Sequence, residues 1–325
     1  MVFLLPKFGI MYDKVKLWCD RAMVGEQFPT IAYRLDNARE ETDLHTGEVK
    51  IFGNLEGLKV GISAGGLFVL GSLAKYLYGS NIYPLDRRTT AEAVEKLSDG
   101  LCIPISGARV LSLEFGMTFL MKHPVADYLE RLGEMPRLSR GMFGGNLYYQ
   151  GRGKDSVKPK VFAFYDKEKE ARKEEGIFPE SLEGKNLLRY EMRLNKRLPH
   201  QLNTTEVKAS TLSDKTFYRG LVGMYQGNYF AIRKTPQIIT NAMDEIRTAG
   251  DAVDLFVARL INQIGQPQIG EYLEELKRAN VFADRKSYSR VKKRIQDIAT
   301  KANITISNEL IRELDDEVRN CGAYV

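Results

Sequence analysis

A tyrosine and two glutamates stand where the alternation of neighbouring residues predicts one shared face of a sheet. Glu114 lies in 109–119, where apolar side chains occupy the odd positions from Leu111 to Phe119. Glu191 lies in 187–194, where apolar and charged residues also alternate, and Tyr165 ends a third such stretch. Because side chains in a strand alternate faces with period two, one side of the sheet gathers the reactive groups. The charged neighbours are Arg189, Arg193, Lys167 and Glu170. This set suits metal-assisted chemistry on a phosphodiester.

The glutamates have two interpretations. Carboxylates from separate strands commonly build Mg²⁺ or Mn²⁺ sites on phosphate enzymes, which makes Glu114, Glu170 and Glu191 candidate metal ligands. They would alternatively be surface acids that pair with nearby arginines on an exposed sheet face. Spacing alone leaves both open.

Tyr165 is a candidate nucleophile, because a phenolate that attacks a DNA phosphorus forms a phosphotyrosine ester and conserves the bond energy for rejoining. Its unperturbed pKa of about 10 requires Lys167 or a metal ion to favour the ionised form. The chain has 16 tyrosines, and most must be structural. Tyr218, Tyr225 and Tyr229 are further candidates for a rejoining step, although a packed helical stripe also explains their spacing.

Composition narrows the class of protein. The 325 residues favour two domains, and the net charge of +6 favours a polyanionic partner. Three scattered cysteines match neither a disulfide framework nor a zinc site, which favours a reducing cytoplasm. The three histidines form no H-x-H pair. No apolar run approaches the ~20 residues of a membrane span, so we expect an intracellular protein without a membrane segment.

The pattern changes near residue 235. The preceding part mixes strand and helix patterns, whereas the rest is amphipathic and helical. We therefore expect an α+β fold, with an antiparallel sheet and helices on one face, in a catalytic domain over 1–235. A helical, basic DNA-binding or accessory domain would follow over 236–325.

Two basic segments are candidates for contacts with DNA phosphates. Residues 277–294 hold eight Lys or Arg against one acid, with Phe282 and Tyr288 between them. A solvated basic helix face explains that segment equally well. The loop 150–156 is rich in glycine and basic residues but lacks P-loop spacing. The candidate DNA-binding residues are Arg152, Lys154, Arg189, Arg193, Arg290, Lys292, Lys293 and Arg294.

Four segments together resemble the rolling-circle replication initiators of the filamentous-phage type. They are MYDKVKL at 11–17, RVLSLEF at 109–115, FYDKEKE at 164–170 and LRYEMRL at 188–194. They are similar to the family's first strand, its acidic strand, its Tyr-x-Lys segment with a trailing Glu, and its Arg-aromatic-Glu strand. The acidic strand usually carries Asp where this chain has Glu114. The resemblance extends over about 11–234.

The resemblance implies a metal-dependent enzyme that nicks one strand at a DNA origin, single-stranded or supercoiled duplex, in the cytoplasm of a bacterial host. It would stay joined to the 5′ phosphate through Tyr165 and later rejoin the strand. Lys167 would stabilise phenolate or phosphate charge. Glu114, Glu170 and Glu191 would bind Mg²⁺ or Mn²⁺ or act as acid/base groups. Host helicase and polymerase are possible partners. A hydrolytic nuclease that uses water and a non-catalytic DNA-binding regulator remain alternatives.

Overall fold

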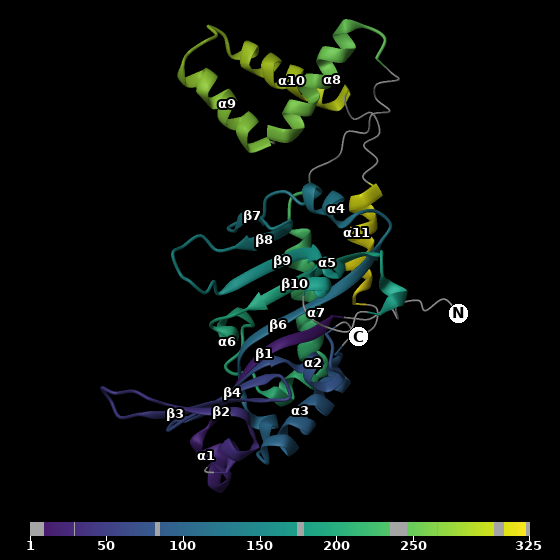
Figure 1. Ribbon diagram of the computed structural model, residues 1–325. Helices are drawn as coiled ribbons and strands as arrows, with labels where there is room; N and C mark the ends of the chain where they lie inside the picture. Colours follow the sequence, from purple (N-terminus) through teal and green to yellow (C-terminus); the bar gives the residue numbers. More distant parts are fainter. Residues whose placement is uncertain are drawn as a thin grey trace. The chain divides into compact units, whose positions relative to one another are not determined.

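A ten-stranded antiparallel sheet organises the protein (Figure 1). The computed structural model describes residues 10–28, 30–81, 85–173, 179–234, 246–264, 266–301 and 309–322. The strand order is β2-β3-β4-β5-β1-β6-β10-β9-β8-β7. The strands are β1 Met11–Asp20, β2 Asp36–Thr42, β3 Val49–Leu55, β4 Leu58–Ser63, β5 Gly66–Ser72, β6 Arg109–Met121, β7 Ser139–Phe143, β8 Asn146–Gln150, β9 Lys160–Asp166 and β10 Asn186–Leu194.

Helices complete the fold and confirm the predicted α+β class. They are α1 Arg21–Val24, α2 Leu73–Tyr78, α3 Arg87–Leu101, α4 Val125–Arg131, α5 Lys167–Lys173, α6 Leu198–Gln201, α7 Lys215–Phe230, α8 Ala249–Ile264, α9 Gln266–Arg278, α10 Arg285–Lys301 and α11 Glu309–Asn320. No helix in the described ranges combines the length and apolarity needed to cross a membrane.

Helix α7 packs on the sheet face that we call the covered face. The Tyr225 ring lies 4.1 Å from the Tyr190 ring of β10, centroid to centroid, and its hydroxyl donates to the Tyr190 carbonyl at 2.9 Å. Asp214 caps the helix, since its carboxylate accepts from the Phe217 backbone N–H at 2.7 Å. Because strand side chains alternate, the neighbours of Tyr190 point to the opposite side, which we call the pocket face.

Two irregularities in the pairing of β1 with β6 shape the pocket face. Tyr12 pairs with Phe115 and Val15 with Leu113, so Asp13 and Lys14 together oppose the single residue Glu114. Such a bulge lets two consecutive side chains leave the regular alternation, and both Asp13 and Lys14 line the same pocket as Glu114.

The second irregularity corrects one expectation. Lys16 pairs with Ser112 and Leu17 with Val110, which leaves Leu111 as the extra residue of β6. Leu111 is 37% exposed, whereas Leu113 and Phe115 are fully buried. The strict alternation predicted for 111–119 therefore starts only at position 113.

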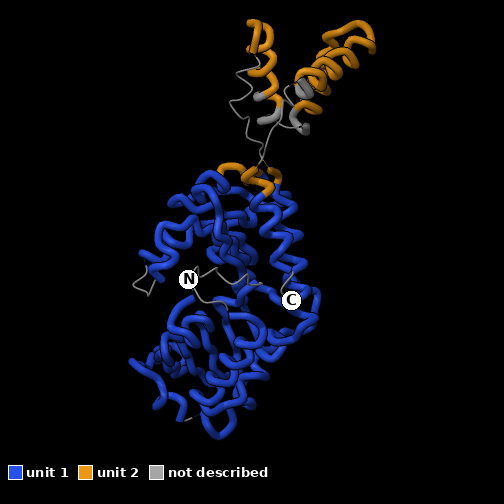
Figure 2. The backbone as a smooth tube through the Cα atoms, turned by 90° about the vertical axis from the view of Figure 1, so that its right-hand side faces the viewer, with its two compact units in different colours: residues 1–129, 134–232, 313–325 blue, residues 130–133, 233–312 orange. Residues whose placement is uncertain are grey.

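The chain divides into two compact units (Figure 2). Unit 1 comprises 1–129, 134–232 and 313–325, and unit 2 comprises 130–133 and 233–312. The C-terminal end thus returns to unit 1, which differs from the expected domain over 236–325. Within unit 1, Leu314 and Val318 of α11 are fully buried, and the Gln226 amide donates to the Val318 carbonyl at 3.1 Å. Unit 2 has a small core around Leu255 and Ala258.

Candidate active site

A pocket of about 380 Å³ lies on the pocket face of the sheet in unit 1. Its lining includes carboxylates and the candidate tyrosine, from β1, β6, β9, β10 and α5. It also includes lysines from β1, β4 and α2 (Lys14, Lys59 and Lys75). The fold thus brings together residues from elements that are far apart in the chain. The acidic and phenolic members are Asp13, Glu114, Tyr165, Glu170 and Glu191.

Glu191 is the most buried carboxylate of the pocket, at 2% exposure. The Tyr165 hydroxyl donates to its Oε2 at 2.8 Å, and the Nε of Arg193 lies 3.3 Å from its Oε1. Burial opposes ionisation, but the charges of Arg193 and Arg189 and the Tyr165 hydrogen bond outweigh it and lower the pKa of Glu191. Glu191 is therefore ionised at neutral pH.

Small residues flank Glu191 in the sheet. It pairs with Gly116 on β6 and with Ala163 on β9. Directly paired residues point to the same face, so two positions beside the carboxylate carry no large side chain. A Cβ on Gly116 would lie 2.3 Å from the Tyr190 carbonyl oxygen, which shows how closely β6 and β10 approach there. The glycine lets the two strands pack closely at the carboxylate.

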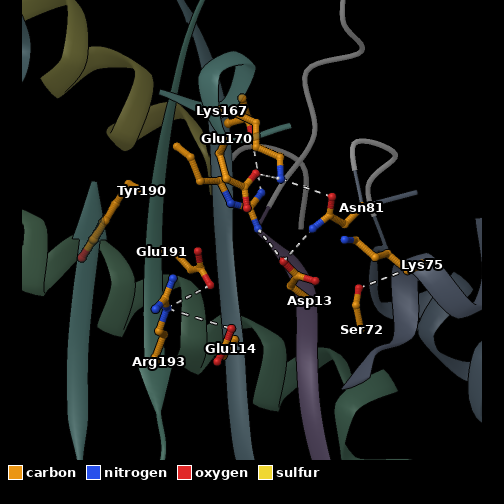
Figure 3. A network of polar contacts seen from close by, with 12 residues as sticks. Asp13, Ser72, Lys75, Asn81, Glu114, Lys167, Glu170, Tyr190, Glu191 and Arg193 are labelled. Carbon is orange, nitrogen blue, oxygen red and sulfur yellow. Dashed lines mark hydrogen bonds and ion pairs between the residues drawn. The ribbon is translucent and has the colours of Figure 1, made fainter. Parts of the chain in front are cut away.

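Glu114 lies next to Glu191 and has the opposite ionisation tendency. Its Oε2 is 4.0 Å from the Arg193 Nε, so the two carboxyl groups share one guanidinium (Figure 3). Burial and the adjacent Glu191 charge raise the pKa of Glu114 to about 8. Two carboxylates this close do not readily ionise together, which leaves Glu114 protonated at neutral pH.

Tyr165 is buried, at 5% exposure, although it lines the pocket. Burial and the charge of Glu191 raise its pKa well above the ordinary value for a phenol. The phenolate is therefore disfavoured at rest, and attack by this oxygen requires a base. The Glu191 carboxylate, which already accepts the phenolic proton in a hydrogen bond, occupies that position.

A chain of polar contacts connects α5 to β1 (Figure 3). The Lys167 ammonium donates to Glu170 Oε2 at 2.6 Å and to Asn81 Oδ1 at 3.2 Å. The Asn81 amide in turn donates to Asp13 Oδ2 at 3.4 Å. Lys167 is only 3% exposed, so its charge lies inside the protein, with Glu170 as its nearest counter-charge.

The three glutamates expected as metal ligands divide into a pair and a separate residue. Glu114 and Glu191 share Arg193, whereas Glu170 is bound to Lys167. Across the described ranges, no three His, Cys, Asp or Glu side chains form a group that could hold a metal ion. All three glutamates and Asp13 nevertheless line one pocket, and their oxygens are the donors that Mg²⁺ and Mn²⁺ prefer. Their role as ligands stays a prediction.

The candidate DNA-binding residues occupy different environments. Arg189, expected to contact DNA, is instead buried at 2% exposure. Its guanidinium lies 3.8 Å from Asp13 and donates to the Thr118 hydroxyl at 3.4 Å. Arg193 is occupied by the two carboxyl groups. The remaining six are exposed, Arg152 and Lys154 in the β8–β9 loop and Arg290, Lys292, Lys293 and Arg294 on α10 of unit 2.

Sequence reasoning missed two members of the pocket face. Asp13 lies in the segment MYDKVKL, but only the β1 bulge brings it into the same pocket as Glu114. Tyr148 pairs with Ala163, which pairs with Glu191, so this half-buried tyrosine lies in the same row of the sheet. Apolar alternation in 146–150, with Leu147 and Tyr149 buried, would have assigned Tyr148 to this face.

The tyrosines of α7 lie on the covered face. The hydroxyl of Tyr218 donates to the Ile10 carbonyl at 2.5 Å, and that of Tyr229 donates to Asp315 at 2.8 Å. Tyr225 donates to Tyr190, and all three rings are buried. The sheet therefore separates them from the pocket, and the packed helical stripe is the correct explanation of their spacing.

Comparison with known proteins identifies the family. The model of the N-terminal region of the phage replication-associated proteins of the gene II type matches residues 49–213, which is half of the chain. The match contains β6, β9 and β10, and with them Glu114, Tyr165 and Glu191. No curated protein matches the chain. The chain belongs to this family of phage replication-associated proteins, the replication initiators of the filamentous-phage gene II type.

Proposed function

We propose that this replication initiator nicks one DNA strand through a covalent bond to Tyr165 and later rejoins it. The observation that carries the proposal is the 2.8 Å hydrogen bond from the Tyr165 hydroxyl to the ionised Glu191, inside a pocket that lysines also line. A nucleophile held by a base that is itself oriented by a third group is the usual arrangement for activating a hydroxyl. Arg193 supplies that third group.

In the proposed reaction, the Tyr165 oxygen attacks the scissile phosphorus and transfers its proton to Glu191. The bond between phosphorus and the 3′ oxygen breaks, and that oxygen leaves with a proton from water or a nearby acid. A phosphotyrosine ester holds the 5′ end. In the reverse reaction, a 3′ hydroxyl gives its proton to that water or acid and attacks this ester, the bond between phosphorus and the Tyr165 oxygen breaks, and Tyr165 recovers its proton from Glu191. Positive charge from the pocket lysines Lys14, Lys59 and Lys75 would attract the phosphate.

The family resemblance also implies a divalent cation. Glu114, Glu191 and Glu170 would hold it, because they place hard oxygen donors around one pocket. When bound, Mg²⁺ or Mn²⁺ would neutralise phosphate charge and polarise the phosphorus–oxygen bond. Host helicase and polymerase, which would unwind and extend the nicked strand, remain proposed partners.

The decisive experiment is incubation with labelled single-stranded origin DNA and Mn²⁺, followed by a denaturing gel and peptide mass spectrometry. We expect a DNA adduct on Tyr165 that disappears in Tyr165→Phe and persists in Tyr148→Phe, which removes the neighbouring phenol of the same face. An adduct on Tyr148 would keep the reaction class and reassign the nucleophile. Cleavage without any adduct would overturn the covalent mechanism in favour of a hydrolytic nuclease.

A further inference from the structure

A row of aromatic side chains crosses the sheet from β3 to β1. Phe52 pairs with Gly61, Gly61 with Phe68, and Phe68 with Trp18. Residues paired in this way point to the same face, so the three rings form one line across four strands. All three are half-buried. Large aromatic rings that remain partly exposed in a continuous line differ from an ordinary core.

The row lies on the pocket face. Lys14 lines the pocket, and Trp18 follows it by four residues on β1, in uninterrupted register with β5. Four residues of a strand span roughly 13 Å, which is about four stacked nucleotide steps of ~3.4 Å. The opposite face is the core side, since Cys19 and Leu67, one position away, are fully buried. The row therefore lies on the same face as the candidate active site, four residues along β1 from Lys14.

Cations accompany each part of the row. The Lys16 ammonium lies 5.1 Å from the centre of the Phe68 ring, and the Arg39 guanidinium lies 5.9 Å from that of Phe52. At the other end, the Trp18 indole N–H donates to Asp20 at 2.7 Å, and Arg109 donates to the same carboxylate oxygen at 2.8 Å. The shared Asp20 orients the indole and keeps a guanidinium beside it.

Gly61 makes the row possible. A Cβ at this position would lie 2.2 Å from Cε1 of the Phe68 ring, so no other residue leaves room for the ring in its present place. Phe68 lies over the glycine, and its ring centre is 6.3 Å from that of Phe52. The two rings thus form neighbouring platforms on the sheet surface.

We propose that this row, Phe52, Phe68 and Trp18 with Lys16 and Arg39, binds the unpaired bases of single-stranded DNA beside the pocket. Every base has a flat π surface that stacks on an aromatic ring, and the interleaved cations contact phosphates, so such a surface binds strands regardless of sequence. The inference rests on the proposed function in one respect, because the bound strand is the one that enters the pocket for nicking.

Trp18 provides a direct readout, because it is the only tryptophan of the chain. The full-length protein is titrated, in EDTA, with an oligothymidine and with an abasic oligonucleotide of the same length and phosphate charge. We expect the oligothymidine to quench Trp18 fluorescence and to bind more tightly than the abasic strand. The difference between the affinities for the two strands separates the contribution of base stacking from that of charge attraction.

The matched variants are Phe68→Leu and Phe143→Leu. The first removes a ring from the row but keeps an apolar side chain, and the second makes the same change at a residue that is 82% exposed on β7. We expect Phe68→Leu to weaken oligothymidine binding roughly 5- to 150-fold with little effect on the abasic strand, and Phe143→Leu to bind like wild type. A thermal melt of each variant confirms folding, and Lys16→Gln provides a second variant that leaves every ring in place.

Three results would overturn the inference. They are equal affinity for oligothymidine and the abasic strand, an unchanged base preference in folded Phe68→Leu, and equal quenching by duplex DNA, which would exclude recognition of unpaired bases. None of these results depends on cleavage. A DNA adduct without any base preference would support the nicking function and reject DNA binding by the aromatic row. A base preference without an adduct would support DNA binding by the row and reject the nicking function.

Discussion

The partners of the Glu191 carboxylate determine what its substitution should do. It accepts the Tyr165 hydroxyl and pairs with Arg193, while Arg189 lowers its pKa. Its neighbour Glu114 has its pKa raised to about 8 by burial and by Glu191. Two adjacent carboxyl groups with opposite ionisation tendencies can take different roles, and the base is the one that stays ionised.

We expect Glu191→Gln to lower adduct formation by about 100-fold or more, which is the usual contribution of a general base. DNA binding should persist, because Gln keeps the shape of the side chain. The same change leaves Arg193 with a weaker partner, so the variant should also melt at a lower temperature. The adduct assay, a binding titration and a thermal melt separate these effects.

Glu168→Gln is the matched control. Glu168 on α5 accepts from Arg172 at 2.7 Å, so this variant also loses an ion pair, but its residue does not line the pocket. It should keep nicking activity. If Glu191→Gln forms the adduct at the wild-type rate, Glu191 is not the base.

At the scale of elements, the close approach of β6 and β10 positions the carboxyl pair. Gly116 faces Glu191 across the ladder, and a Cβ there would meet the Tyr190 carbonyl oxygen at 2.3 Å and the Glu191 Cα at 2.8 Å. These are backbone atoms, which cannot rotate away as the end of a side chain can. Any larger residue must therefore push β10 away from β6.

We expect Gly116→Ala to destabilise the protein by about 1–3 kcal/mol and to reduce adduct formation, because it displaces Glu191. Denaturant unfolding and the nicking assay measure the two effects. The control is Gly141→Ala in the edge strand β7, where a Cβ would meet nothing within 4 Å. This control should be nearly neutral in both assays. Full activity and stability in Gly116→Ala would mean that strand spacing does not position the site.

At the scale of the whole molecule, the candidate active site lies in unit 1 and the basic segment 277–294 in unit 2. Helix α10 carries exposed Arg290, Lys292, Lys293 and Arg294. The chain then returns to unit 1, where the Tyr128 hydroxyl donates to Glu313 at 2.5 Å and Leu314 is fully buried. Unit 2 is thus an insertion within the chain of unit 1, and truncation near residue 235 would remove α11 from unit 1.

We expect the double reversal Lys292→Glu and Lys293→Glu to weaken DNA binding and to reduce the slope of log affinity against log salt. Loss of two phosphate contacts should change that slope by about 1.4–1.8. The measurement is a salt titration of binding. The reversal of exposed Lys185 and Lys196 in unit 1 controls for the change in total charge. An unchanged slope in the α10 variant would exclude this face from the DNA contact.

Local alternation was sufficient to predict much of the pocket. Period two assigned Glu114, Glu191 and Tyr165 to one face and Tyr190 to the other, because the pleat is a property of each strand by itself. The motifs also identified the family, and the α+β class followed from the mixture of patterns. These features depend on residues that are close together in the chain.

Only the tertiary structure decided how these residues meet. The β1 bulge that adds Asp13, the extra residue at Leu111 and the burial of Arg189 all depend on the register between strands distant in sequence. The same holds for the aromatic row through Gly61. Register is determined by the packing of whole faces and by bulges, and a local pattern contains neither. The sequence by itself therefore determined that Glu114, Tyr165 and Glu191 share one face, and the fold decided which other side chains line the pocket and which of them touch.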